Sequence, residues 1–235
     1  MDNTTPILLV PGLVSSPRIY APVISALWAI GPVTVANHIR DDNMGAIARR
    51  ILDEAPPRFA LAGHSMGGYI AFEIMRQAPD RVLRLALLNT QARPDTPEAT
   101  SRRRSQMARS EAGDFRDVLN ELFPIFVHRM RRDRADLLQL VHDMGRDVGV
   151  DAFIRQQTAI IGRADSRPTL ATISCPTLVL TGDQDLAIPN SLSKEMADGI
   201  AGAKLVILSQ CGHLSQVEQP EEPRMRWSNG YDSRS

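Results

Sequence analysis

The chain has 235 residues, 43% of them hydrophobic, and its 27 basic and 27 acidic side chains balance to a formal net charge of +0. The balanced charge offers no electrostatic basis for a nucleic-acid partner or an anionic membrane surface, and no apolar run approaches the roughly 20 residues that span a bilayer. Because the first residues carry no basic leader segment and the two cysteines, Cys175 and Cys211, have no metal-site spacing, we expect a cytoplasmic protein that acts on a small molecule and keeps both thiols reduced.

Short apolar runs alternate with longer helical patterns along most of the chain. The predicted strands are 7–10, 33–36, 59–62, 85–89, 177–181 and 204–208. Nearly every position in these runs is apolar, which is typical of strands buried on both faces of a sheet. The predicted helices between them are 18–29, 44–55, 65–77 and 191–200. This alternation predicts an α/β fold with a mostly parallel, doubly wound sheet of about six strands and right-handed crossovers.

The segment from 91 to 168 interrupts the alternation, because it contains helical patterns (100–110, 115–126, 132–145 and 152–162) and no convincing strand. An insertion between the fourth and fifth strands would lie above their carboxyl ends, where open α/β sheets bind ligands. We therefore expect a core formed by residues 1–90 and 169–235, and a helical cap formed by residues 91–168 that closes the site from water. The alternative is a helical subdomain that does not contact the substrate.

The predicted cap is rich in arginine, at 102–104 and 109 and again at 129–134, with acidic residues interspersed. Such runs are usually solvated helix faces. The alternative is that one of these arginines steers an acidic substrate.

The most informative motif is GHSMG at residues 63–67, directly behind the apolar run 59–62. It fits G-x-S-x-G, in which a strand turns so tightly into a helix that the residues beside the serine must have almost no side chain. Such a corner keeps the serine hydroxyl exposed, so the motif predicts Ser65 as a nucleophile. Serine is also a favoured helix N-cap, which is the alternative interpretation.

A nucleophilic serine needs a base within hydrogen-bond reach, and the base needs an acid that orients it. Among the five histidines, His213 stands directly after the last predicted strand, at the carboxyl edge of the sheet, where the Ser65 turn must also open. The acid should come from TGDQD at 181–185, which ends the fifth strand. Either aspartate could serve there. We favour Asp185, which lies further out in the loop, and interpret Asp183 as a turn or capping residue.

Two backbone N–H groups should stabilise the oxyanion that forms when an acyl carbonyl is attacked. One is that of Met66, after the nucleophile, and the other is that of Leu13, at the end of the first strand. The first and third strands should be neighbours, so the loops after both flank one crevice. Gly12 permits a close backbone approach there, and we count Gly12 and His64 among the residues that contact the substrate. No metal and no cofactor is expected.

These segments resemble the α/β-hydrolase family in its small form with a helical cap. The resemblance is carried by residues 8–13, 63–68, 180–185 and 212–214. In the family the acid is usually the aspartate three residues after the glycine of G-x-x-D, which falls on Asp185. The resemblance implies Ser65 as nucleophile, His213 as base, and the N–H groups of Leu13 and Met66 as the oxyanion hole.

Two features depart from the family pattern. The family often has His-Gly before the oxyanion donor, where this chain has Pro11 and Gly12. After residue 221 a family member usually continues into an amphipathic helix packed on the sheet, whereas residues 222–235 are polar and contain Pro223, which opposes a full helix. Sheet surface left uncovered in this way would favour self-association, so the monomer and a homo-oligomer are both compatible with the sequence.

The sequence therefore predicts a serine hydrolase that cleaves a small, largely apolar carboxylic ester through an acyl-enzyme. One alternative is a cofactor-free carbon–carbon bond hydrolase of β-diketone-like substrates that uses the same three residues and prefers an acidic substrate. A lyase or a perhydrolase-like activity on this scaffold is another. The alternative from a different class is a ligand-binding or regulatory protein of the same fold with little turnover.

Overall fold

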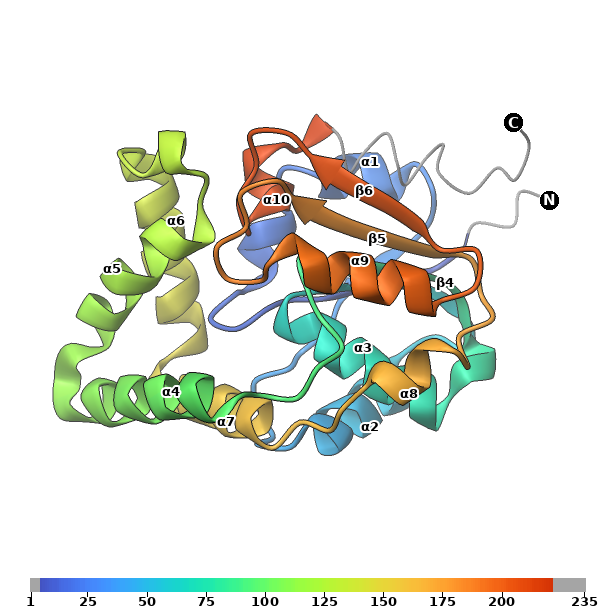
Figure 1. Ribbon diagram of the computed structural model, residues 1–235, viewed down its shortest axis with the longest axis horizontal. Helices are drawn as coiled ribbons and strands as arrows, with labels where there is room; N and C mark the ends of the chain where they lie inside the picture. The colour runs from blue at the N-terminus through green and yellow to red at the C-terminus, as the bar shows by residue number, and fades with distance from the viewer. Residues whose placement is uncertain (1–4, 222–235) are drawn as a thin grey trace.

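The computed structural model describes residues 5–221 and contains one six-stranded sheet whose strands all run parallel (Figure 1). The strands are β1 (Ile7–Val10), β2 (Val33–Val35), β3 (Phe59–His64), β4 (Val82–Leu88), β5 (Thr177–Gly182) and β6 (Lys204–Leu208), in the order β2-β1-β3-β4-β5-β6. The predicted α/β class and the parallel, six-stranded sheet are confirmed. Because the chain moves out from β1 to β2 and then returns to β3, the strand order switches direction between β1 and β3.

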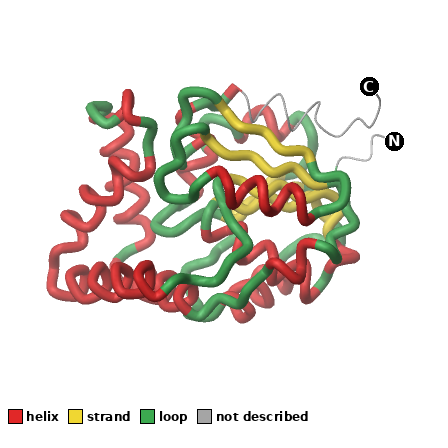
Figure 2. Tube along the Cα trace, in the orientation of Figure 1, coloured by secondary structure: helices red, strands yellow, loops and turns green. Residues whose placement is uncertain are grey.

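Helices cover both faces of this sheet (Figures 1 and 2). Successive side chains of a strand point to opposite faces, so Leu8 and Val10 pack into one apolar cluster and Ile7 and Leu9 into another. The first cluster is completed by α2 (Met44–Glu54), α3 (Met66–Gln77), α8 (Arg167–Leu170) and α9 (Asn190–Gly199). The second is completed by η1 (Pro17–Tyr20), α1 (Ile24–Trp28) and α10 (Ser215–Glu218). A single turn, η2 (Pro79–Arg81), joins α3 to β4.

The sheet edges and the first helix differ from the prediction. Thr34 in β2 and Lys204 and Ile207 in β6 are exposed, since each of these strands lies at an edge that the flanking helices cover only in part. Burial on both faces is therefore wrong for β2 and β6, although every residue of β1 and β5 is buried. The predicted helix 18–29 is also wrong. It divides into η1 and α1 around Pro22, which has no N–H to donate and disfavours a continuous helix.

Four helices between β4 and β5 form a separate group beside the sheet, at the left in Figure 1. They are α4 (Pro97–Arg109), α5 (Phe115–Phe126), α6 (Ala135–Val148) and α7 (Val150–Ile161), with a π-helical turn, η3 (Ser110–Asp114), and a 3-10 turn, η4 (Arg129–Arg131), between them. We call residues 97–161 the helical insertion. Its side chains Phe123, Val141 and Phe153 pack into the second apolar cluster, so the insertion shares a core with the sheet.

The predictions for the C-terminal segment 222–235, including the missing helix and the self-association that would follow, lie outside the described residues. Within residues 5–221, no helix combines the length and the apolar composition needed to cross a membrane.

The amino end of α3 lies directly against the end of β1. A Cβ atom placed on Gly67 would lie 2.1 Å from the carbonyl oxygen of Val10, and one placed on Gly63 would lie 2.3 Å from the carbonyl oxygen of Gly67. These separations are far shorter than any van der Waals contact. The turn from β3 into α3 therefore requires glycine at both positions.

We predict that Gly67→Ala lowers the free energy of unfolding by about 2 kcal/mol or more, because the added methyl group collides with backbone that cannot move without displacing β1. The measurement is urea denaturation followed by circular dichroism. Gly162→Ala is the matched control, since its Cβ would lie 3.6 Å from the nearest atom, and it should change stability by less than about 1 kcal/mol. Equal stability of the two variants would contradict this account of the turn.

Candidate active site

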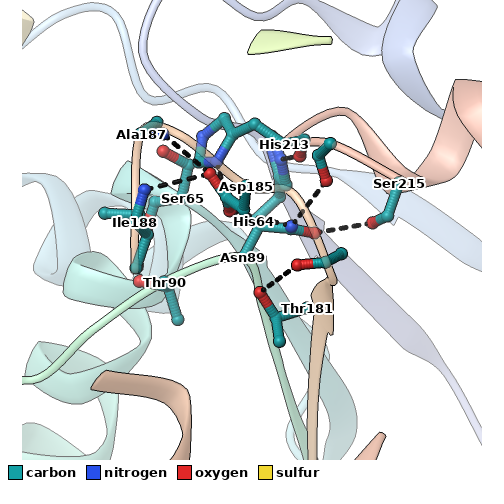
Figure 3. A network of polar contacts seen from close by, with 12 residues as sticks. His64, Ser65, Asn89, Thr90, Thr181, Asp185, Ala187, Ile188, His213 and Ser215 are labelled. Carbon is teal, nitrogen blue, oxygen red and sulfur yellow. Dashed lines mark hydrogen bonds and ion pairs between the residues drawn. The ribbon is translucent and has the colours of Figure 1, made fainter. Parts of the chain in front are cut away.

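Ser65 lies at the corner between β3 and α3, with backbone angles φ 53° and ψ −116° (Figure 3). A residue other than glycine in this region is strained, at a cost of about 1–3 kcal/mol. Three hydrogen bonds hold the corner: the Ser65 N–H donates to the Leu88 carbonyl at 2.9 Å, and the Ser65 carbonyl accepts from the Thr90 hydroxyl at 2.7 Å and from the Gly68 N–H at 2.9 Å. The Ser65 side chain makes no capping hydrogen bond to α3, so its hydroxyl is available for another role.

His213 and Asp185 form a buried pair. The ring atom Nδ1 of His213 lies 2.8 Å from Oδ2 of Asp185, and the two residues are 3% and 6% exposed. Because the carboxylate accepts the Nδ1 proton, the other ring nitrogen, Nε2, is the one left to act as a base. The order of the strands explains why Asp185 and His213 are in contact. Asp185 follows β5, His213 follows β6, and these strands are neighbours.

Several donors hold the Asp185 carboxylate in place. Oδ1 accepts from the N–H groups of Ala187 and Ile188, both at 2.9 Å, and Oδ2 accepts from the Asn89 amide at 3.0 Å (Figure 3). Burial by itself would raise the pKa of this carboxyl. The positive charge that His213 can carry, together with the hydrogen bonds from His213, Asn89 and Ile188, outweighs burial and holds the pKa below its usual range. Asp185 therefore stays ionised beside the ring.

The loop that carries His213 is fixed from two sides. The N–H groups of His213 and Leu214 donate to the carbonyl of Phe126, at the end of α5, and the Phe126 ring stacks on the His213 ring at 5.5 Å between centroids. The carboxylate of Glu218 accepts from the N–H of Gly212 at 3.0 Å and from the N–H of His128 at 2.7 Å. The helical insertion thus supports the orientation of the His213 imidazole.

Ser65, His64 and His213 line a single cavity of about 370 Å³. Among the described residues, no hydrogen bond joins the Ser65 hydroxyl to the His213 ring. Such contacts are often loose without substrate and shorten in the complex. The walls come from both parts of the chain, including Leu13 and Tyr69 from around the sheet and Arg102, Leu122, Met144 and Ile160 from the helical insertion.

His64 lines this cavity but also has a second contact. Its Nε2–H donates to the carbonyl of His213 at 2.9 Å, and the two rings lie 5.1 Å apart. Burial, and then the charge of His213, lower the pKa of His64 to about 3, so the ring is neutral at physiological pH. The structure therefore places His64 as a support of the His213 backbone as well as a pocket wall.

Asp183, the other aspartate of the loop, does not reach His213. It is exposed, and its Oδ1 accepts from the N–H of Cys211 at 3.0 Å. This contact ties the end of β5 to the loop after β6, which is the structural role that the sequence indicates for Asp183.

The loop after β1 meets the Ser65 turn. A Cβ atom on Gly12 would lie 3.0 Å from Cβ of Ser65, so Gly12 packs against Ser65 and does not line the cavity, whereas Leu13 does. Within residues 5–221, the N–H groups of Leu13 and Met66 have no hydrogen-bond partner. Two free donors therefore flank Ser65, as an oxyanion hole requires.

A buried brace holds the loop that carries Leu13. The carbonyl of Gly12 accepts from Nε2–H of His38 at 2.9 Å, and the N–H of Val14 donates to Oε1 of Gln156 at 3.0 Å. Gln156 belongs to α7, so a side chain of the insertion fixes the backbone on one side of Leu13, and His38 fixes it on the other.

Asn89, Glu218 and Gln156 hold the site but are not among the residues that the sequence predicts for it. Asn89 had a usable signal, because it directly follows β4, at the edge where the other polar residues gather. Gln156 had none, since its partner Val14 is 142 positions away and nothing local marks the contact. Among the described residues, no group of three or more His, Cys, Asp or Glu is arranged to hold a metal ion.

Known proteins that are similar to this chain include several hydrolases. A family model described as alpha/beta hydrolase fold matches residues 11–220. The chain is 26% identical over 187 residues to the pimeloyl-(acyl-carrier protein) methyl ester esterase of Nitrosomonas europaea, covering 77% of this chain and 74% of that protein. It is 25% identical over 193 residues to a 2-hydroxy-6-oxononadienedioate/2-hydroxy-6-oxononatrienedioate hydrolase of a Pseudomonas species, covering 78% and 66%.

Among solved structures, the chain is similar to a thermophilic esterase from Thermogutta terrifontis with malate bound. The TM-score is 0.86 at 27% identity, and the match covers 96% of this chain and 89% of the esterase. All three relatives are hydrolases by name, and their substrates differ. The comparisons therefore place the chain among hydrolases and leave its substrate to other arguments.

The two buried histidines predict a loss of stability in mild acid. Burial lowers the pKa of His38 to about 4 and that of His64 to about 3, against 6.5 in an unfolded chain. Between about pH 4 and pH 6.5 the unfolded state binds protons that the folded state does not, so stability rises with pH in this range. At pH 5 each histidine should lower the free energy of unfolding by about 2 kcal/mol relative to pH 7.

The measurement is urea denaturation at pH 7 and pH 5, for the wild type and for His38→Gln. Each protein is compared with itself, so any direct effect of the substitution cancels. The variant should lose about 2 kcal/mol less than the wild type between the two pH values. An equal loss in both proteins would show that His38 titrates normally in the folded state.

Proposed function

We propose, on the premise that this chain belongs to the alpha/beta hydrolase fold family, that it hydrolyses carboxylic esters through Ser65. The observation that carries the proposal is the cavity shared by a strained, uncapped serine and a buried His213–Asp185 pair. A fold of this kind hosts many reactions, so the residues of the site, rather than the family, support this reaction.

In the proposed reaction, the Ser65 hydroxyl attacks the acyl carbonyl while Nε2 of His213 takes its proton. Asp185 keeps the imidazole in the tautomer with the proton on Nδ1 and offsets the charge that forms on the ring. The N–H groups of Leu13 and Met66 bind the oxyanion. His213 then protonates the leaving alcohol, and a water molecule that His213 deprotonates releases the acid from Ser65.

The cavity supports a small substrate with an apolar segment. Its volume of about 370 Å³ lies at the lower end of the range for small-molecule sites, and Leu122, Met144 and Ile160 contribute apolar walls. Because all three of these residues belong to the helical insertion, we also propose that residues 91–168 act as a cap that excludes water from the acyl-enzyme.

A carbon–carbon bond hydrolase is the second candidate. It would use the same three residues, and the arginines in the cavity wall favour the acidic substrate that the sequence analysis associates with it. Turnover of β-diketone-like acids compared with esters of matched size separates the two reactions.

Ser65→Ala is the direct test of the nucleophile. We predict that the wild type shows a burst of p-nitrophenol from p-nitrophenyl butyrate, and that Ser65→Ala abolishes the burst and lowers kcat by about 10³ or more. Ser101→Ala, which alters an exposed serine of α4, should leave both unchanged. Retained turnover in Ser65→Ala would reject the nucleophile. A wild type that binds esters but cleaves none would favour the ligand-binding alternative.

The two aspartates of one loop form a matched pair for testing the acid. We predict that Asp185→Asn lowers kcat on the order of 10⁴-fold, because an amide cannot hold the productive tautomer of His213. Asp183→Asn keeps an oxygen that accepts from the Cys211 N–H, so its effect should stay below about tenfold. Steady-state kinetics on the same ester compares them. A larger loss of kcat in Asp183→Asn than in Asp185→Asn would show that Asp183, and not Asp185, is the acid.

A further inference from the structure

One wall of the cavity is polar where a helix usually presents apolar side chains. Ala99, Arg102, Arg103 and Gln106 of α4 all line the cavity. Their spacing of i, i+3, i+4 and i+7 places them on one face of the helix. Helices generally direct apolar residues toward a packed interior at this spacing, yet no residue of α4 is buried. The polar face of α4 is therefore directed at the space where substrate would lie.

The charge on this wall is positive. Arg102 and Arg103 line the cavity, and no aspartate or glutamate among residues 5–221 does. Arg103 and the buried Arg163 share the carboxylate of Asp95, at 3.2 Å and 2.9 Å, and the charge of Arg102 acts on Glu98. The cluster of Arg102, Arg103 and Arg163 thus carries three positive charges against two carboxylates. The cluster therefore keeps an excess positive charge beside a partly enclosed cavity, where a field is screened less than in open solvent.

Several donors on this wall have no partner among the described residues. Arg102 forms no hydrogen bond or ion pair there, although its charge acts on the nearby Glu98. Arg103 donates through Nε to Asp95 and through Nη1 to Gln157, which leaves Nη2. Gln106 accepts from Gln157 through Oε1, which leaves its own NH₂ group. The arrangement offers guanidinium and amide donors and lacks an acceptor to match them.

A solvated helix face is the competing explanation, and α4 contains its own comparison. Arg104 is an exposed arginine on the same helix that does not line the cavity. Solvation accounts for Arg104. It does not account for Arg103, whose side chain is 21% exposed, with its guanidinium held against Asp95 and Gln157.

We propose that the α4 wall, formed by Arg102, Arg103 and Gln106, is an anion subsite that binds a carboxylate at the far end of the substrate. The inference rests on the proposed ester hydrolysis and names its substrate class: half-esters of dicarboxylic acids, with an apolar chain between the ester and the free acid. Guanidinium groups match the two oxygens of a carboxylate, and apolar side chains such as Leu122 and Met144 line the same cavity. A phosphonate shares this chemistry and is a further arm of the test.

The test compares kcat/KM for monomethyl esters of C4 to C10 dicarboxylic acids with that for methyl alkanoates of equal length. Methyl esters of phosphonoalkanoic acids form the third series. The wild type should prefer an anionic series over the neutral one by tenfold or more at one chain length, and the preference should fall as salt is added. The series with the larger preference identifies the anion.

Arg102→Gln should reduce the ratio of anionic to neutral kcat/KM by about fivefold or more, because it removes the charge and keeps hydrogen-bonding capacity. Arg104→Gln, the matched control from the same helix, should leave the ratio unchanged. An equal ratio in the wild type and Arg102→Gln, or an equal fall in both variants, would overturn the anion subsite.

The outcomes separate this inference from the proposed function. Hydrolysis of neutral esters without any anion preference would reject the subsite while esterase activity stands. If no ester is cleaved, calorimetric titration with C4 to C10 dicarboxylates still judges the subsite. Tighter binding by the wild type than by Arg102→Gln supports it, and equal Kd values or no binding reject it.

Discussion

The contact between the Ser65 turn and the end of β1 is the constraint on which the rest of the site depends. Gly63 and Gly67 let β3 turn into α3 so close to neighbouring backbone that no residue with a Cβ atom fits at either position. This close approach holds Ser65 at a positive φ angle, with its hydroxyl uncapped, and brings Gly12 against it. The positions of Ser65, the proposed nucleophile, and of Leu13, the proposed oxyanion donor, thus follow from one packing arrangement at the ends of the neighbouring parallel strands β1 and β3.

The helical insertion supports the site as well as covering part of it. Its α5 end holds the backbone of His213 through the Phe126 carbonyl, and its α7 residue Gln156 holds the backbone beside Leu13. A displacement of the insertion would therefore move the proposed base and the proposed oxyanion donor together. The proposed catalytic geometry therefore depends on the position of the insertion, in addition to any exclusion of water.

The predictable parts of this protein are those whose chemistry is local in the sequence. Buried parallel strands are continuous apolar runs, so β1 is predicted to the residue, and the glycines around Ser65 mark the turn. The bounds of β6 are also predicted to the residue, although that edge strand is partly exposed. Asp185 and His213 follow adjacent strands, and the structure brings them into contact. Side chains that act across long separations, such as Gln156 on Val14 or Glu218 on His128, carry no local signal and emerge only from the packed structure. Pro22 is a local signal for the break between η1 and α1, because proline disfavours a continuous helix.

The central claim is that Ser65 is an activated nucleophile served by the His213–Asp185 pair. Mass spectrometry of the protein after treatment with a p-nitrophenyl alkylphosphonate tests this claim most directly, because a phosphonylated serine is stable and can be mapped to one peptide. The account predicts one adduct per chain, located on Ser65, which forms much more slowly in Asp185→Asn. An unmodified Ser65, or an adduct formed at the same rate without the Asp185 carboxylate, would contradict it.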